Sequence, residues 1–250
     1  MKKKICLCLM VLALAALSLA GCSTLDYSYE NADKYTAGDK VIADKIDKID
    51  LDYVAGNVDI TAAVGNAISV KETANRELEE KEMVHTWVDG TTLRIKYCAS
   101  DCGMSVEDLE KNLTLAVPKN IGLDEMKLDL AAGDLKADLG KIGKFKLDAA
   151  AGDLDVTAAG VKVFDVDAAA GNCTFDFAKA PGKTSIDAAA GDIKIKLPKD
   201  CDLTLKIDMA AGDLNFDLPF KKKDKAYVCG NGSSVMSIDC AAGDINITGR

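Results

Sequence analysis

The sequence is poor in the residues on which many enzymes depend. Histidine and tryptophan each occur once in 250 residues, as His85 and Trp87, and arginine occurs only at Arg76, Arg94 and Arg250. A single histidine leaves little scope for a Ser-His-Asp triad or for a zinc site. No glycine-rich phosphate loop is present. We therefore expect a protein that is not an enzyme and that holds no cofactor, apart from the calcium considered below.

Basic residues are also outnumbered. The chain has 31 lysines and arginines against 40 aspartates and glutamates. Proteins that bind nucleic acid carry a basic footprint, so nucleic acid is not an expected partner. An acidic surface suits solubility or the collection of cations. The exception is a cluster of four lysines, Lys221, Lys222, Lys223 and Lys225. These lysines could contact anionic lipid or wall polymer, or they could form a solvated loop.

The first 22 residues have the pattern of an export signal. Lysines at positions 2–4 precede an apolar run over 5–19, and small residues stand just before Cys22. The run of about 15 residues is shorter than the roughly 20 that a transmembrane helix needs. The ending resembles a bacterial lipobox, which implies cleavage before Cys22 and attachment of lipid, including palmitate-like acyl chains, to that cysteine. We expect a signal peptide over 1–21, and a lipidated cysteine and tether over 22–45.

Cleavage would leave an exported protein anchored by lipid to the extracytoplasmic face of a bacterial membrane. Two or more acyl chains, at roughly 0.8 kcal/mol per buried CH2, make such an anchor stable without any protein contact. Loss of the three leader lysines takes the net charge from −9 to −12. The mature protein is therefore expected to be acidic and displayed at the cell surface.

A repeat governs the chain from residue 46 onward. Its anchor is a glycine that follows an alanine and precedes Asp or Asn, and an aspartate stands four residues before each glycine. From the second anchor on, successive glycines are 19, 19, 20, 21 and 31 residues apart. The anchors are Gly56-Asn57, Gly133-Asp134, Gly152-Asp153, Gly171-Asn172, Gly191-Asp192, Gly212-Asp213 and Gly243-Asp244.

Apolar residues alternate within each repeat, and the alternation slips by one at the glycine. They stand five, three and one residues before it, and two, four and six residues after it. A period of two indicates strands, and no helical apolar period accompanies the alanines. One strand cannot shift its parity and keep one face buried. The glycine and its Asp or Asn are therefore predicted to form a corner between two strands.

A unit of about 20 residues cannot bury its own apolar face, whereas stacked neighbours can. We expect an all-β fold, a single-chain parallel β-solenoid (β-helix-like) with about 20 residues per coil and an N-terminal β-hairpin elaboration. The alanines beside the corner are expected to line a narrow interior. Separate antiparallel hairpins are the alternative, because parity does not fix strand direction.

The solenoid domain is expected over residues 46–250. An uncapped solenoid end can pair with another chain, so we expect a homodimer through the C-terminal coil near Gly243. A hairpin is predicted to turn at Asp89-Gly90. The parts of the domain are an irregular hairpin part (66–118), regular coils (124–218), a loop excursion (219–237) and a last coil (238–250).

The repeated Asp-x-Ala-Ala-Gly-Asp motif, as in residues 148–153, resembles that of a known family. The opening strand that ends at Gly56-Asn57 and the non-repeating hairpin region also fit. The family is the "putative adhesin" family of bacterial β-strand-repeat lipoproteins, a domain of unknown function, and the resemblance covers about residues 46–250. It implies a β-helix-like fold on a secreted or membrane-tethered protein. It brings no catalytic residues.

The aspartate column suggests one candidate site. Stacking in register would place like charges about 5 Å apart, with a repulsion of about 1 kcal/mol per pair in water. Calcium, which takes about 6–8 oxygen ligands, could bridge neighbouring carboxylates. The alternative is that these are ordinary outward residues of half-buried strands. The candidate cation ladder consists of Asp129, Asp148, Asp167, Asp187, Asp208 and Asp239.

His85 and Trp87 lie two residues apart and should face the same side of one strand. They could form a sugar-stacking ligand patch, or they could simply pack within the hairpin.

The positions of the cysteines indicate which of them could form disulfides. Export permits a disulfide between Cys98 and Cys102, and a staple between return loops at Cys201 and Cys229. Cys173 and Cys240 occupy apolar columns three coils apart, so they are expected to be core thiols too distant to bond.

The expected function is that of a non-catalytic cell-surface lipoprotein, an adhesin or a surface binding or scaffold domain. Its expected partners are the membrane, through the lipid anchor, and a surface polymer, glycan or protein ligand. The first alternative is a cation-binding or purely structural envelope protein. A more remote one is a polysaccharide-active β-helix enzyme, which would need a pair of catalytic acids. The acids of this chain stand instead at repeated structural positions.

Overall fold

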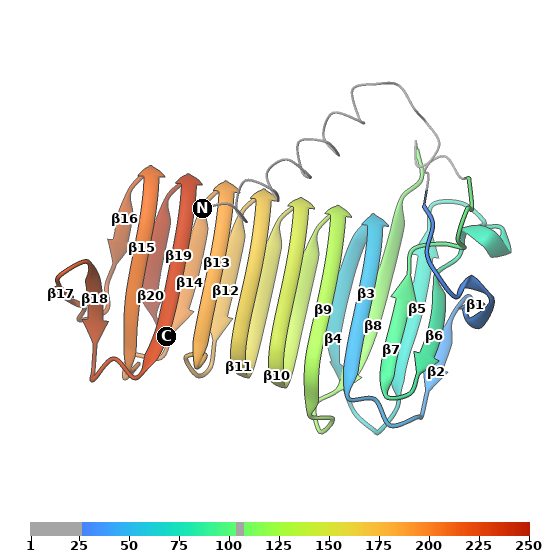
Figure 1. Cartoon of the computed structure of the whole chain (residues 1–250), viewed down its shortest axis with the longest axis horizontal. Coiled ribbons are helices and arrows are strands. Elements are labelled where there is room, and N and C mark those ends of the chain that lie inside the picture. Colours follow the sequence, from blue (N-terminus) through green and yellow to red (C-terminus); the bar gives the residue numbers. More distant parts are fainter. Residues whose placement is uncertain (1–26, 104–107) are drawn as a thin grey trace.

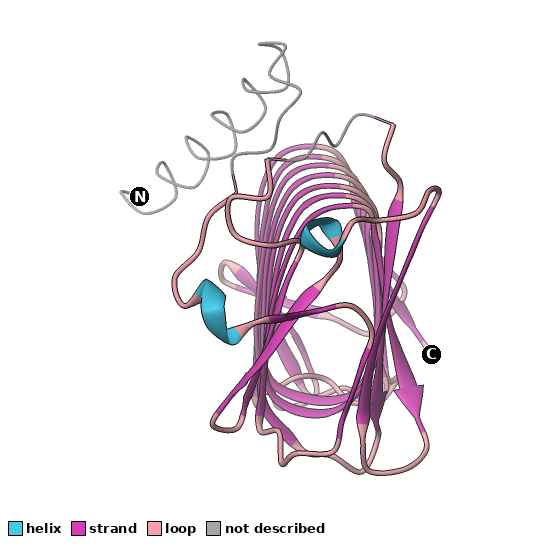
Figure 2. Ribbon diagram, turned by 90° about the vertical axis from the view of Figure 1, so that its right-hand side faces the viewer, coloured by secondary structure: helices cyan, strands magenta, loops and turns pink. Residues whose placement is uncertain are grey.

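The computed structural model describes residues 27–103 and 108–250. This part of the chain contains twenty strands and no α-helix, with two short 3-10 helices, η1 (Ala32–Lys34) and η2 (Glu80–Glu82). The strands stack along one long axis (Figure 1). Figure 2 shows, end on, two facing walls joined along one edge by an arch. The all-β, solenoid-like prediction is confirmed.

One wall contains the strands that lead to the glycine corners, and the other contains the strands that leave them. We call these the first wall and the second wall. In spatial order the first wall contains β7 (Thr92–Lys96), β3 (Lys48–Ala55), β9 (Leu123–Ala132), the second halves of β10 (Leu135–Ala151) and β11 (Leu154–Ala170), β13 (Lys183–Ala190), β19 (Ser234–Ala242) and β15 (Leu203–Ala211). The second wall contains β8 (Lys111–Pro118), β4 (Asn57–Ala63), the first halves of β10 and β11, β12 (Cys173–Phe177), β14 (Ile193–Leu197), β20 (Ile245–Gly249) and β16 (Leu214–Phe216). Neighbours within each wall pair in parallel, with equivalent residues of the repeat side by side.

The two walls enclose one continuous hydrophobic core. On β12, for example, Cys173, Phe175 and Phe177 are buried and the residues between them are not. The Phe145 and Phe164 rings stack at 5.2 Å between centroids, and Phe164 meets Phe175 edge-on at 5.1 Å. The strand alternation of the sequence is thus the alternation between core and solvent.

The alanines nearest the corner do not face the core. The alanine three residues before the glycine is buried, as at Ala149 and Ala168, whereas the alanine directly before it is exposed, as at Ala151 and Ala170. The prediction that the column beside the glycine lines the interior is therefore wrong. The chain already bends over the arch there, which turns this position to the outside.

Each corner is a close stack of backbone. The seven corner glycines have φ between +109° and +141°, a region that residues with a side chain rarely adopt. A Cβ on Gly152 would lie 2.0 Å from the carbonyl oxygen of Gly133, and the same approach recurs from coil to coil. Glycine is required because the neighbouring backbone occupies the space of a side chain.

The Asp or Asn after each glycine ties adjacent corners together. Its side-chain oxygen accepts a hydrogen bond from the backbone amide of the equivalent residue in the next coil. A typical bond of this kind contributes about 1 kcal/mol, and together they form what we call the corner ladder. Its bonds run from the amides of Asp134, Asp153, Asn172, Asp192, Asp244 and Asp213 to the side chains of Asn57, Asp134, Asp153, Asn172, Asp192 and Asp244, at 2.8–3.1 Å.

Antiparallel strands cover the first end of the stack. β6 (His85–Asp89) forms with β7 the hairpin that Asp89-Gly90 predicts, and β5 (Ile68–Ala74) pairs with β8. β1 (Thr36–Ala37) and β2 (Lys40–Ile42) then extend β6 and β5. Residues 27–45, expected to be tether, are therefore docked on the domain from Tyr27 onward.

At the other end the order of coils differs from the order of the sequence. β19 lies between β13 and β15, and β20 lies between β14 and β16. The C-terminal coil is therefore interior, and the coil of β15 and β16, the end coil, finishes the stack (Figure 1). The expected homodimer contact near Gly243 is wrong, because both edges of that coil are already paired. The excursion 219–237 is not only a loop, since β17 (Lys221–Lys223) and β18 (Ala226–Cys229) form a hairpin that pairs with β15.

We expect Gly152→Ala to destabilise the protein by about 3 kcal/mol or more, because it combines a left-handed backbone with a clash against Gly133. Gly160→Ala is the matched control in the adjoining strand, since a Cβ there meets nothing within 4 Å. Its cost should stay below about 1 kcal/mol. Denaturant unfolding of both variants measures the difference, and equal stabilities would contradict the role assigned to the corner.

Candidate functional site

The aspartates of the repeat form a straight row on the outer face of the first wall. The buried residues on either side of each aspartate, such as Leu147 and Ala149 around Asp148, force the carboxylate outward. We call this row the aspartate face. The register brings together all six predicted residues and one more, in the order Asp52, Asp129, Asp148, Asp167, Asp187, Asp239 and Asp208.

Lysines balance the row at its first end. The ion pairs are Lys96 with Asp52 at 3.0 Å, Lys127 with Asp129, and Lys146 with Asp148. Lys127 and Lys146 stand two residues before their partners and so share their face of the strand. In the next coils this lysine position is taken by Asp165, Ser185 and Ser237. The aspartate face is thus neutralised at one end and more acidic toward the middle.

Asp167 lies where the balancing lysines stop. Burial, followed by the neighbouring Asp148, Asp187 and Asp165, raises the pKa of Asp167 to about 6. Burial acts on Asp148 as well, but Lys146 together with hydrogen bonds to Asp129 and Asp167 outweighs it and lowers the pKa of Asp148. This part of the row therefore takes up a proton more readily than an ordinary aspartate does.

The row does not form a closed metal cage. Over residues 27–103 and 108–250, no group of three or more His, Cys, Asp and Glu side chains is placed to hold a metal ion. Two neighbouring carboxylates of one column supply few of the roughly 6–8 oxygens that calcium takes. The carboxylates of the corner ladder already accept backbone amides. The aspartate face is therefore suited to cations held loosely along its length.

The N-terminal segment covers the predicted ligand patch. His85 is buried, and its Nδ1 lies 2.8 Å from the carbonyl oxygen of Met83. Trp87 is half-buried and meets Tyr35 edge-on at 5.6 Å, while the Arg94 guanidinium lies 5.8 Å from the indole ring. These contacts account for both side chains by packing. A ligand role for the pair stays a prediction.

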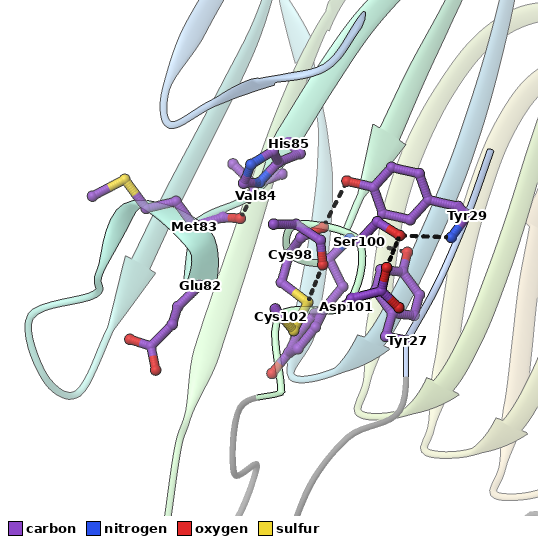
Figure 3. Close-up of a disulfide and its surroundings, with 12 residues drawn as sticks. Tyr27, Tyr29, Glu82, Met83, Val84, His85, Cys98, Ser100, Asp101 and Cys102 are labelled. Atoms are coloured by element: carbon purple, nitrogen blue, oxygen red, sulfur yellow. Dashed lines mark hydrogen bonds between the residues drawn. A yellow bond between two sulfur atoms is a disulfide. The ribbon is translucent and has the colours of Figure 1, made fainter. Parts of the chain in front are cut away.

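A disulfide joins Cys98 and Cys102 at the same end, with Cα atoms 6.5 Å apart (Figure 3). The Tyr29 hydroxyl donates to the carbonyl of Cys98 at 3.0 Å, and the Tyr29 amide donates to the Ser100 hydroxyl at 3.1 Å. The bridged loop thus holds the N-terminal segment against the stack. Sequence reasoning missed this docking, for which the only signal was tyrosines in an otherwise polar stretch.

A buried ion pair that sequence reasoning also missed closes the corner stack. Lys111 occupies the place of a corner glycine beneath Gly56, and its side chain is fully buried. Its ammonium donates to the carbonyls of Glu82 and Tyr97, both at 2.6 Å, and pairs with Glu72 at 2.9 Å. Burial lowers the pKa of Lys111 and raises that of Glu72. Three acceptors nevertheless engage all three ammonium hydrogens, so this lysine is structural rather than reactive.

Comparison with known proteins assigns the family. A family model described as Toastrack DUF4097 matches residues 112–248, which is more than half of the chain. The chain belongs to the Toastrack DUF4097 family. The family resemblance carried by the repeat motif is thus confirmed, over a shorter stretch of the Toastrack chain than the expected 46–250. No curated protein matches it.

Solved structures share the Toastrack fold. A structure described as a "putative cell adhesion protein" from Clostridium sporogenes ATCC 15579 has a TM-score of 0.55 at 20% identity, covering 86% of this chain and 100% of that one. A "putative adhesin" from Bacteroides fragilis NCTC 9343 has a TM-score of 0.39 at 13% identity, covering 86% and 97%. At such sequence identities the likeness concerns the fold alone. The first of these structures supports the shared fold.

The described part of the Toastrack chain contains no helix that is both long and apolar enough to cross a membrane. Cys22 and the expected signal peptide, 1–21, lie outside the described residues. Cleavage and lipid attachment at Cys22 therefore stay predictions.

We expect the melting temperature to rise by about 2 °C when the pH falls from 7.5 to 5. The folded protein binds a proton at Asp167 near pH 6, whereas the unfolded chain binds it only near the ordinary value of 3.8. Stability from this group is therefore present at low pH and is lost as the pH rises through 6.

Asp167→Asn should remove most of this rise and increase stability at pH 7.5, because it deletes a repelled charge. Asp155→Asn, on the outer face of the second wall in the same strand, is the control and should keep the wild-type profile. Thermal unfolding at both pH values measures the effect. A rise that persists unchanged in Asp167→Asn would contradict the assignment.

Proposed function

We propose that this Toastrack protein is a non-catalytic surface lipoprotein that binds an extended partner along the aspartate face. The observation that carries the proposal is the repetition of one carboxylate per coil, from Asp129 to Asp208, on neighbouring strands about 4.8 Å apart. A rigid row suits a polymer or cell surface that presents groups at intervals, because many weak contacts add up. The description of the Clostridium sporogenes relative as a "putative cell adhesion protein" supports adhesion.

The positions of the acids support a role without catalysis. A catalytic pair of carboxyl groups should depart from the structural repeat. Two half-buried or buried acids outside the repeat, Glu72 and Glu82, are engaged by Lys111 at 2.9 Å and by Arg76 at 2.8 Å. The acids of the repeat lie either in the corner ladder or on the outward-facing aspartate face, and the latter favours surface contact.

The charge of the row indicates the chemistry of the partner. Beside Asp167 the aspartate face has Asp165 at the position that Lys146 occupies in the preceding coil. A partner with cationic groups complements this stretch, such as an amino-sugar polymer or glycan, or a basic protein surface. We propose this cationic partner in addition to the membrane, which the protein would contact through the lipid on Cys22.

The test is binding of the detergent-purified lipoprotein to an array of glycans, cell-surface polymers and basic proteins. We expect selective binding to cationic members. The triple variant Asp167→Asn, Asp187→Asn, Asp239→Asn should weaken it at least about tenfold, or about 1.4 kcal/mol. The control carries the same charge change on the second wall, at Asp59, Asp138 and Asp155, and should bind normally.

Equal losses in the two triple variants would reduce the effect to net charge and exclude the aspartate face as the binding site. A blank array would favour a structural envelope role instead. In that case neither the aspartate face nor the His85–Trp87 patch would retain a ligand.

A cation-binding role is the second candidate, favoured by the pKa of about 6 at Asp167, which a bound cation would relieve. The same array and a melting curve, run with millimolar calcium and with chelator, decide it. A bound ion adds about 2.7 kcal/mol of stability at 100 times its dissociation constant. An unchanged melting point would exclude this role.

For the anchor, we expect Cys22→Ser to abolish incorporation of a labelled fatty acid and to release the protein from the membrane fraction. The thioether needs the Cys22 sulfur, whereas Cys8→Ser in the same leader is a control that should keep the label. Fractionation and fatty-acid labelling of the two variants measure this. Label retained in Cys22→Ser would rule out the lipobox assignment.

We place the proposed homodimer at the end coil rather than at the coil near Gly243. Ile207, Met209 and Leu214 are only half-buried there. The exposed lysines of β17 lie on the outer strand of the hairpin, beyond β18, where lysine discourages further strand pairing. Self-association would therefore use the apolar side chains of the end coil.

A further inference from the structure

Two buried cysteines meet where the β17–β18 hairpin joins the end coil. Cys201 lies in the turn between β14 and β15, where its amide donates to the carbonyl of Pro198 at 3.0 Å. Cys229 ends β18 and stands opposite Leu203 in the antiparallel pairing with β15. The two residues are 5% and 3% exposed. Both are free cysteines, and the neighbouring Cys229 contributes to raising the pKa of the Cys201 thiol.

The surrounding backbone fixes this meeting independently of the sulfurs. A Cβ on Gly230 would lie 3.2 Å from the carbonyl oxygen of Cys201. The Asp202 carboxylate accepts the amide of Ser233 at 3.1 Å, and the Asp202 carbonyl accepts the amide of Ser234 at 3.1 Å. The turn that carries Cys201 is therefore held against the segment that follows Cys229.

We propose that Cys201 and Cys229 form a second disulfide, which ties the β17–β18 hairpin to the turn that begins the end coil. Gly230, directly after Cys229, packs against the backbone of Cys201 and Asp202, so the two cysteines lie on adjoining backbone segments, as such a bond requires. The inference rests on the export proposed above, because an extracytoplasmic compartment permits disulfides. The disulfide between Cys98 and Cys102 is consistent with the same compartment.

The bond forms by exchange with a donor disulfide, that of a thiol oxidoreductase or of oxidised glutathione. One cysteine thiolate attacks the donor and gives a mixed disulfide, and the second displaces the donor sulfur. The protein loses two electrons and two protons, and the donor leaves as two thiols. Burial and the adjacent Cys229 raise the pKa of Cys201 to about 12. Exchange therefore takes place before the hairpin closes over the pair.

The bond would enclose residues 201–229, which include the end coil and its hairpin. The strands of the end coil pair with β19, β20 and the hairpin and with no other coil among the described residues. The disulfide would thus keep the terminal unit of the stack together and hold β18 against the start of β15, at Leu203–Leu205.

Cys173 and Cys240 are an internal comparison. Both are buried thiols, on β12 in the second wall and on β19 in the first. The coil of β13 and β14 lies between them. They are two coils apart, rather than the three that sequence order suggests, because the C-terminal coil is inserted. About 10 Å of stacking still exceeds the roughly 7 Å limit between Cα atoms.

The test is mass spectrometry of the full chain extracted from membranes, denatured, alkylated without reductant and digested with trypsin. We expect peptide 200–206 linked to peptide 226–250, with Cys173 and Cys240 alkylated. We also expect Cys201→Ser/Cys229→Ser to melt roughly 5–10 °C below the wild type. Cys173→Ser/Cys240→Ser, which also removes two buried thiols, should melt closer to the wild type.

A second preparation separates this inference from the proposed export. The mature chain, residues 22–250, is made in the cytosol and refolded with oxidised glutathione. A linked peptide in both preparations supports the bond and the export. A link only after refolding upholds the pairing and overturns the export. Alkylated Cys201 and Cys229 in both preparations overturn the disulfide.

Discussion

The approach of one corner backbone to the next, so close that no Cβ fits between them, sets the geometry of the whole stack. It requires glycine at the seven corners. It also brings each following Asp or Asn within reach of the next coil's amide, as between Asp153 and Asp134 at 2.8 Å. Because this contact fixes the register of neighbouring coils, it also aligns the carboxylates of the aspartate face. The candidate binding surface is thus a by-product of how the corners pack.

That alignment has an electrostatic cost that the chain offsets unevenly. Lys127 and Lys146 neutralise the row on two coils, and Lys96 does so at its first end. Beyond them burial, followed by the neighbouring carboxylates, raises the pKa of Asp167 to about 6. At the next position of the lysine column stands Asp165, which adds to the repulsion instead of offsetting it. The proposed binding role would use these unbalanced charges.

Local features of the fold follow from the sequence because they depend on short-range chemistry. The slip in apolar parity at each glycine predicts the corner, and Asp89-Gly90 predicts the hairpin between β6 and β7. The aspartate face follows from the same alternation. The exposed alanine at Ala151 does not, although it continues the apolar alternation, because it is the last residue of β10 before the glycine corner.

Long-range features could not be read from the sequence, because the repeats are nearly equivalent to one another. Columns of like residues fit in many orders, so nothing local places the coil of Gly243 between those of Gly191 and Gly212. The docking of Tyr27 and Tyr29 depends on a loop more than 60 residues away, around Ser100. The buried role of Lys111 could not be predicted, because its partners Glu72, Glu82 and Tyr97 come from other parts of the chain.

The interior position of the C-terminal coil sets the order in which the protein can be completed. Residues 203–229 emerge from the ribosome or the export channel before residues 234–249, yet in the finished molecule the later segment lies inside the earlier one. β15 carries at Ile207-Asp208 the same Ile-Asp pattern that β19 carries at Ile238-Asp239, so the edge of β13 would accept either strand. A solenoid one coil too short would therefore compete with the native fold in the growing chain. Correct assembly requires that the position beside β13 goes to the last residues to arrive.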